Sequence, residues 1–218
     1  MQQFIEGFNS FFNGTAGRVV SAAIALVLVM AIAGWFFKKT SSPKILVYMA
    51  MCLALASVLS VFKLFPGWLQ GGSITLCSML FVSLIGYFFG PSAGIIGGIT
   101  YGFIQFTIGP STIIHPVQLF MDYPLAFAAL GLSGFLHNKK FGLCTGFIFG
   151  ALIRGVIHTI SGVIFYSEYA KAANKNVWIY SSEYNFSYII PEMILTCAII
   201  AIPVVYKSFG RIKSTAVR

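Results

Sequence analysis

Seven long apolar stretches constrain the fold of this chain more than any other feature of its sequence. Each is long enough, or nearly so, to cross about 30 Å of hydrocarbon as a helix. None shows the residue-by-residue alternation of a membrane β-barrel strand, which excludes a barrel. The sequence therefore predicts an all-α integral membrane protein. The expected helices cover residues 18–37, 44–64, 73–89, 93–109, 115–136, 141–166 and 187–206.

Composition excludes the soluble and the disordered classes. Charged residues make up 9% of the 218 residues and hydrophobic residues 58%, whereas a soluble domain carries about 25% charged residues. The net charge of +9 does not indicate nucleic-acid binding, because the cations lie between the apolar stretches rather than in a basic stripe with aromatic residues.

The positions of these cations predict the orientation of the chain, because Lys and Arg accumulate in short cytoplasmic loops. Nine of the fourteen fall on one side, which we assign to the cytoplasm. We therefore expect a multi-pass plasma-membrane protein with its N-terminus outside and its C-terminus cytoplasmic. The longest loop, about residues 167–186, is then extracellular. The nine cations are Lys38, Lys39, Lys44, Lys139, Lys140, Lys207, Arg211, Lys213 and Arg218.

The first apolar stretch resembles a signal peptide only superficially. Its positive cluster follows the apolar run instead of preceding it, and the run from Val19 to Phe37 is too long for a signal-peptide core. We expect a retained helix. Residues 1–40 then form an N-terminal segment with one extra transmembrane helix, and residues 41–218 form a six-helix membrane domain.

Polar side chains at membrane depth are the candidate functional residues. An ionisable side chain there costs about 2.5–3.5 kcal/mol on insertion scales, so it indicates a functional site by default. Four of the expected helices carry such residues on one face, nearly all of them in the outward half. This pattern predicts a pocket that is open to the outside and closed to the inside. The residues are Tyr101 and Gln105; His115, Gln118 and Asp122; Arg154, His158 and Ser161; and Asn185, Tyr188 and Glu192.

The same residues also allow purely structural interpretations. Asp122 and Arg154 would neutralise each other as a structural ion pair, and Gln118 and Gln105 would form interhelical hydrogen bonds. His158 would be a satisfied packing residue. Tyr166 and Trp178 would be interfacial aromatics.

Enzymatic and cofactor-dependent functions lack their motifs. The metalloprotease motif HExxH is absent, and Asp122 is the only aspartate, which excludes a paired-aspartate mechanism. The four cysteines lack metal-ligand spacing, so we expect no metal and no other cofactor. The chain also lacks a nucleotide-binding loop, and we expect that it does not hydrolyse ATP itself.

Four segments together resemble one known family. They are Gly71–Met79 (GGSITLCSM), Gln118–Gly134 (QLFMDYPLAFAALGLSG), Arg154–Ala170 (RGVIHTISGVIFYSEYA) and Tyr180–Glu192 (YSSEYNFSYIIPE). In this order they resemble the thiamine-specific substrate-binding (S) component of energy-coupling factor (ECF) vitamin transporters. The resemblance covers about residues 44–207.

The resemblance implies a six-helix S-component core to which the first helix is an addition. Such a protein captures thiamine from the extracellular side with high affinity. It then pairs with a membrane-embedded T component and two cytoplasmic ATPases, whose ATP hydrolysis drives it to topple and release the vitamin inside. Small-residue faces dock the T component in this family, which assigns that role to Ala50 and Ala54. Intramolecular close packing is the alternative for this pair.

The resemblance also implies a set of binding residues. Asp122 takes the place of the acidic residue that binds the aminopyrimidine, and Tyr123 follows it. Tyr166 and Tyr101 stand where the family commonly has Trp, and Trp68 lies near another aromatic position, occupied here by Gly71. The other matching residues are Arg154, His158, Tyr180 and Asn185, and the polar face of the fifth stretch adds Gln118.

The chemistry of these residues fits thiamine, a planar cation with a hydrogen-bonding pyrimidine. Aromatic rings such as Tyr166, Trp178 and Tyr180 attract a cation by about 0.5–2 kcal/mol each. Arg154 and His158 would repel the thiazolium, so we expect Arg154 to be held by Asp122 or Glu192, or to bind a phosphate-bearing form. Two alternative functions stay open. One is an S component for a different vitamin or precursor, and the other is a stand-alone channel or facilitator.

Overall fold

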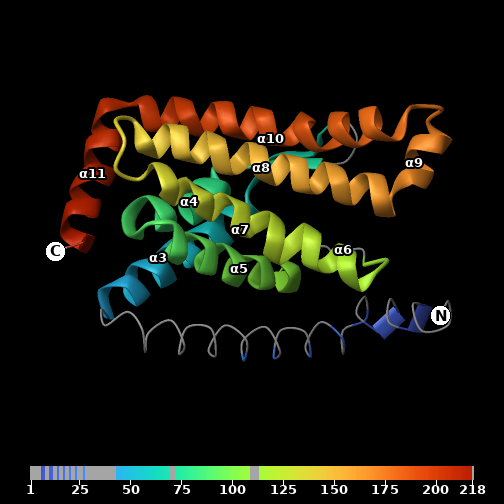
Figure 1. Cartoon of the computed structure of the whole chain (residues 1–218), viewed down its shortest axis with the longest axis horizontal. Coiled ribbons are helices and arrows are strands. Elements are labelled where there is room, and N and C mark those ends of the chain that lie inside the picture. The colour runs from blue at the N-terminus through green and yellow to red at the C-terminus, as the bar shows by residue number, and fades with distance from the viewer. Residues whose placement is uncertain are drawn as a thin grey trace.

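The computed structural model describes residues 43–68, 72–108 and 113–217 together with isolated positions before residue 28. The expected helix over residues 18–37 lies almost entirely outside the described residues. The described residues after this stretch are mostly helical and include one β-hairpin (Figure 1). Its elements are α3 (Pro43–Val61), β1 (Lys63–Trp68), β2 (Gly72–Thr75), α4 (Ser78–Phe89), α5 (Pro91–Ile108), α6 (Pro116–Phe120), η1 (Met121–Leu125), α7 (Ala126–Gly131), η2 (Leu132–Leu136), α8 (Gly142–Phe165), α9 (Ser167–Ala172), α10 (Val177–Ala201) and α11 (Pro203–Val217).

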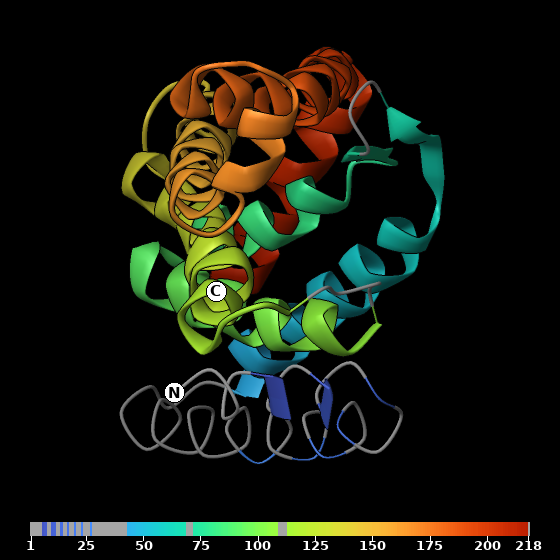
Figure 2. The same cartoon turned by 90° about the vertical axis from the view of Figure 1, so that its right-hand side faces the viewer.

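Six helical runs form the core, as the sequence predicts for the part after the first stretch. Four of them are long and apolar enough to cross a membrane: Pro43–Val61, Pro116–Leu136, Gly142–Phe165 and Val177–Ala201. The helices α8 and α10 pack along each other, and α5 packs against α7 (Figures 1 and 2). The short helix α9 lies at one end of the long helices and α11 at the other.

The Pro116–Leu136 run is continuous but not regular. It passes from α6 through the π-helical turn η1 into α7 and ends in the 3-10 turn η2. Pro124 lies inside η1, and a proline lacks the backbone N–H that an α-helix requires from its interior residues. Wide turns of this kind often occur at functional sites. Here the turn carries Asp122 and Tyr123.

Glycines at four-residue spacing bring α5 and α7 into close backbone contact. A Cβ at Gly102 would lie 2.6 Å from the backbone of Tyr123, and one at Gly94 or Gly98 would overlap the backbone of α7. This glycine face is therefore a helix-packing surface, which small residues allow in membranes.

Two boundary predictions are wrong. The chain between α3 and α4 forms the antiparallel β1–β2 hairpin, with Lys63 opposite Thr75 and Trp68 opposite Gly72. The expected helices over 44–64 and 73–89 are shortened accordingly. Within β1, Pro66 disfavours a helix, and Gly67 has φ +65°, a conformation that glycine adopts without steric cost.

The expected loop over 167–186 is mostly helical. It contains α9 and the first turns of α10, which covers Val177–Ala201 instead of the expected 187–206. The Asn176 side chain caps α10 by accepting hydrogen bonds from the backbone N–H groups of Trp178 (3.0 Å) and Ile179 (3.3 Å). Pro203 begins α11, and Ile202 before it is extended, as a residue before proline prefers.

Candidate functional site

A cavity of about 580 Å³ lies between the helices and extends to α9, and it brings most of the predicted site residues together. Its wall combines polar and aromatic groups from η1, α8, α10 and the hairpin. The predicted residues that line it are Gln105, Gln118, Asp122, Tyr123, Arg154, His158, Tyr166, Tyr180, Asn185 and Tyr188.

Asp122 is the best-coordinated charged group of this cavity. The amide Nε2 of Gln118, one turn earlier, donates to Asp122 Oδ2 at 2.7 Å. Asp122 Oδ1 lies 3.2 Å from His158 Nδ1 on α8. Only 17% of the Asp122 side chain and 12% of the His158 side chain is exposed. The alternative interpretation of Asp122 and Arg154 as a structural ion pair is therefore wrong, because His158 is the partner of this carboxylate. Gln118 makes a hydrogen bond within its own segment rather than between helices.

Arg154 makes no salt bridge in the described part of the chain. Its guanidinium carbon lies 4.0 Å from the ring centroid of Phe127, and its Nε and Nη1 atoms are buried without a hydrogen-bond partner. The expectation that Asp122 or Glu192 holds Arg154 is wrong for this conformation. The cation is balanced instead by the electron-rich face of Phe127.

Tyrosines form the aromatic part of the wall. Tyr184 and Tyr188 meet edge to face with ring centroids 6.0 Å apart, and the rings of Tyr166 and Tyr169 lie 6.1 Å apart. The Tyr188 hydroxyl donates to Asn185 Oδ1 at 2.9 Å. Asn185 is thereby fixed in orientation at the wall of the cavity.

Several wall residues are absent from the predicted set. They are Phe127, Tyr169, Ser181 and Tyr184 among others. A four-residue spacing places Tyr180, Tyr184 and Tyr188 on one helical face, and this signal would have found Tyr184. The expected extracellular loop hid it, because Tyr184 was placed outside a helix.

Three predicted aromatic positions have different outcomes. Tyr101 is fully buried behind Phe127, its ring centroid 4.8 Å from that of Phe127, and its hydroxyl donates to the Ala56 carbonyl at 2.9 Å. It supports the wall and does not line the cavity. The side chain of Trp68 lies outside the described residues. Trp178 is 57% exposed and does not line the cavity, in line with the interfacial interpretation.

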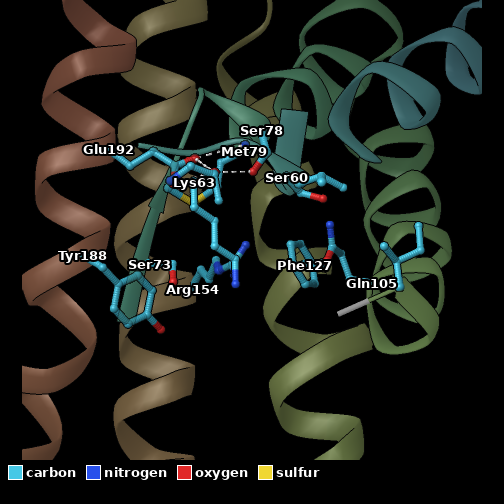
Figure 3. Close-up of a pocket in the computed structure, with 13 residues that line it drawn as sticks. Ser60, Lys63, Ser73, Ser78, Met79, Gln105, Phe127, Arg154, Tyr188 and Glu192 are labelled. Carbon is cyan, nitrogen blue, oxygen red and sulfur yellow. Dashed lines mark hydrogen bonds between the residues drawn. The ribbon is translucent and has the colours of Figure 1, made fainter. Parts of the chain in front are cut away.

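A second chamber of about 430 Å³ adjoins the first (Figure 3). The two share Ser73, Gln105, Phe127, Arg154 and Tyr188 as wall residues. The chamber also contains Glu192, whose carboxylate accepts hydrogen bonds from Thr75 at the end of the hairpin. Within the described residues, no group of three or more His, Cys, Asp or Glu side chains is placed to hold a metal ion.

Comparison with known proteins now decides the family. The model of the family described as thiamine transporter protein (Thia_YuaJ) matches residues 46–210. The chain belongs to this thiamine transporter family. The predicted resemblance to thiamine-specific S components is confirmed, and this family consists of transporters and not of enzymes.

Individual members and a solved structure agree with this assignment. The thiamine transporter ThiT of Bacillus subtilis is 34% identical over 169 residues, which cover 71% of this chain and 86% of that protein. The thiamine transporter ThiT of Lacticaseibacillus paracasei is 29% identical over 108 residues, covering 44% and 53% of the two chains. A solved structure of ThiT from Listeria monocytogenes shares the fold with a TM-score of 0.64 at 23% identity, covering 78% of this chain and 96% of that one.

Proposed function

We propose that the cavity of about 580 Å³ binds thiamine and that this thiamine transporter family member delivers it as the S component of an ATP-driven ECF importer. The observation that carries the proposal is the Asp122 carboxylate, held between Gln118 and His158 in a tyrosine-lined cavity. A thiamine transporter needs a site of this kind for its substrate, and the chemistry of each half of thiamine fits one part of this wall.

The aminopyrimidine half fits Asp122. The carboxylate accepts one hydrogen bond from Gln118 on Oδ2 and faces His158 with Oδ1. Its remaining lone pairs are available to the exocyclic amino group of the pyrimidine in a charge-assisted hydrogen bond. His158 Nε2 is buried and has no hydrogen-bond partner in the described structure, so it is available to the ligand on the other side of the imidazole.

The thiazolium half fits the tyrosine wall. Tyr166, Tyr180, Tyr184 and Tyr188 present ring faces and edges to the cavity, and each favourable cation–ring contact contributes about 0.5–2 kcal/mol. The Arg154 charge lies over Phe127, and both residues also line the chamber of about 430 Å³. A thiazolium among the tyrosines therefore avoids the strongest repulsion. Tyr123 and Asn185 complete the proposed contacts, while Tyr101 acts as a supporting residue.

We assign the α9 end of the bundle to the extracellular side and the α11 end to the cytoplasm. The cations Lys139, Lys140, Lys207 and Arg211 are exposed and lie in the turn before α8 and on α11, as the positive-inside rule requires of the cytoplasmic side. Cavity residues such as Tyr169 and Val177 lie near the opposite end, on α9 and at the start of α10.

Ala50 and Ala54 on α3 are proposed to dock the T component. Both are exposed, and their neighbours Val47, Met51 and Val58 are apolar and more than half exposed. A small-residue face on a membrane helix permits close approach of a second helix. The two cytoplasmic ATPases would act through that partner.

Uptake into liposomes tests the coupling to ATP. Vesicles that contain only this chain should bind labelled thiamine without accumulating it. Vesicles that also contain a T component and both ATPases, with ATP enclosed on the cytoplasmic side, should accumulate it. Accumulation by the chain alone would contradict the ECF assignment and favour a stand-alone facilitator. Tight binding of another vitamin in place of thiamine would favour an S component of different specificity.

A further inference from the structure

Glu192 is a buried carboxylate to which the thiamine-binding proposal assigns no role. It lies on α10 and is 3% exposed. Its hydrogen bonds come from a distant part of the chain. Thr75 donates its backbone N–H to Oε2 at 3.0 Å, and its hydroxyl lies 2.8 Å from both carboxylate oxygens. The N–H of Met79 adds a longer contact to Oε1 at 3.4 Å. Burial of an ionised carboxylate is costly unless hydrogen bonds compensate for it, so these contacts fasten Thr75 firmly to α10.

The segment fastened in this way is part of the cavity wall. Thr75 is the last residue of β2, and Gly72 and Ser73 of the same strand line the cavity of about 580 Å³. Gly72 lies so close to the Tyr188 ring that a Cβ at this position would overlap it. The described side chains of β1, by contrast, are exposed. The hairpin is therefore attached to the bundle mainly through β2 and α10, and Glu192 provides the charged part of this attachment.

Arg154 offers Glu192 a second partner. Both residues line the chamber of about 430 Å³ (Figure 3), on the neighbouring helices α8 and α10. The Nε and Nη1 atoms of Arg154 are buried without hydrogen-bond partners, and no salt bridge of 4 Å or less joins it to Glu192 in the described chain. Two buried opposite charges that are not paired gain considerable energy by pairing. Glu192 instead accepts hydrogen bonds from Thr75, which keep it from pairing with Arg154.

We propose that Glu192 is a positioning residue. It holds β2 against α10 while thiamine is bound, and it pairs with Arg154 when β2 moves away from α10. The inference rests on the proposed function for its role in substrate retention. When Glu192 exchanges Thr75 for Arg154, one set of charge-assisted hydrogen bonds replaces another. The Glu192 carboxylate therefore has a partner in both arrangements. Such a pair of alternative partners makes an element bistable at low cost.

Amide hydrogen exchange of the whole protein without thiamine tests the fastening directly. The readout is the peptide that covers β2 and Thr75, with a peptide from α5 as the internal reference for global unfolding. Thr75→Val removes the hydroxyl donor at constant shape, and Thr75→Ser is the matched control that keeps it. Loss of a hydrogen bond to a charged group should speed exchange of the β2 peptide by at least about tenfold in Thr75→Val. Thr75→Ser should remain within about twofold of the native protein. Equal exchange in the two variants would overturn the proposal.

Arg154→Gln tests whether Arg154 is the alternative partner of Glu192. It removes the alternative partner, so the β2 peptide should exchange several-fold more slowly than in the native protein while the α5 peptide is unchanged. Unchanged β2 exchange would contradict a role for Arg154. Glu192→Gln should exchange faster, as in Thr75→Val, because the amide keeps the size of the side chain but loses its charge.

Thiamine dissociation measures the functional consequence separately. Labelled thiamine should leave Thr75→Val at least about tenfold faster than Thr75→Ser, with a smaller change in its association rate. Equal thiamine dissociation rates in Thr75→Val and Thr75→Ser would contradict a role of the Thr75–Glu192 contact in retaining thiamine. If the protein bound no thiamine at all, the proposed function would fail, whereas the exchange experiment would still decide whether Glu192 fastens the wall.

Discussion

Nδ1 of His158 lies 3.2 Å from Oδ1 of Asp122, and these two residues come from different helical runs. The contact joins the π-helical turn η1 to α8 at the wall of the cavity. It orients the imidazole so that Nε2, which has no partner among the described residues, is the free nitrogen. The only aspartate of the chain thus both joins two helical runs and lines the cavity.

Asp122→Asn should weaken thiamine binding by about 1.5–3 kcal/mol, which is roughly tenfold to a hundredfold in Kd. The amide keeps the size of the side chain but loses the charge that strengthens the hydrogen bond to the aminopyrimidine. Isothermal titration calorimetry of the purified protein measures the change. Glu168→Gln is the control, because that carboxylate is 80% exposed and pairs only with Lys171 one helical turn away. Native affinity in Asp122→Asn would make Asp122 a purely structural residue.

The aromatic wall should contribute through its ring electrons and not only through its apolar surface. Tyr184→Leu keeps an apolar side chain but removes the ring, and we expect affinity for thiamine to fall by about 0.5–2 kcal/mol. Tyr184→Phe keeps the ring and should remain close to the native protein. Competition binding with labelled thiamine checks both variants. If they lost affinity equally, the hydroxyl and not the ring would be the contact.

Close packing of α5 on α7 predicts a contrast between two glycines. Gly94→Ala places a methyl group against the backbone of Gly131 and should destabilise the fold by about 1–3 kcal/mol. Gly210→Ala, in α11, meets nothing within 4 Å of its Cβ and should be neutral or stabilising by about 0.5–1 kcal/mol. Thermal unfolding in detergent measures both. A Gly94→Ala protein as stable as Gly210→Ala would contradict the close approach.

The turn after η2 predicts a pH dependence of stability. Burial lowers the pKa of His137 below its ordinary value, and the nearby Lys213 lowers it further. Lys213 donates to the His137 carbonyl and lies 4.4 Å from the Tyr87 ring centroid. The unfolded chain therefore binds a proton that the folded chain disfavours. This contribution to stability is complete above about pH 6.5 and is lost as the pH falls below it.

His137→Gln should remove that part of the pH dependence. The difference in Tm between the native protein and His137→Gln, followed from pH 8 to about pH 5, isolates this one residue. We expect the native protein to lose more stability than the variant on acidification. Parallel curves would show that His137 does not titrate differently in the folded and unfolded chains.

Much of the site followed from the sequence because ionisable residues at membrane depth are few. Asp122, His158 and Arg154 were predicted to converge, and they do. Their pairing was not predictable, because spacing along a helix fixes a face but not the rotation of one helix against another. Asp122 therefore meets His158, and Arg154 meets the Phe127 ring instead of a carboxylate.

The hairpin and the start of α10 were missed for local reasons. Hydropathy alone does not separate a short apolar strand from a helix end, although Pro66 and Gly67 mark the break. The polar residues before Tyr188 indicated a loop, yet Asn176 caps a helix there. As a result, Tyr184 and the Thr75–Glu192 contact, which joins residues 117 positions apart, could not be found before the fold was known.

Titration of the purified protein with thiamine tests whether the cavity binds this vitamin. We predict saturable one-to-one binding with a dissociation constant well below micromolar, weakened in Asp122→Asn and retained in Glu168→Gln. Absence of saturable thiamine binding in that range, together with tight binding of a different vitamin, would contradict it.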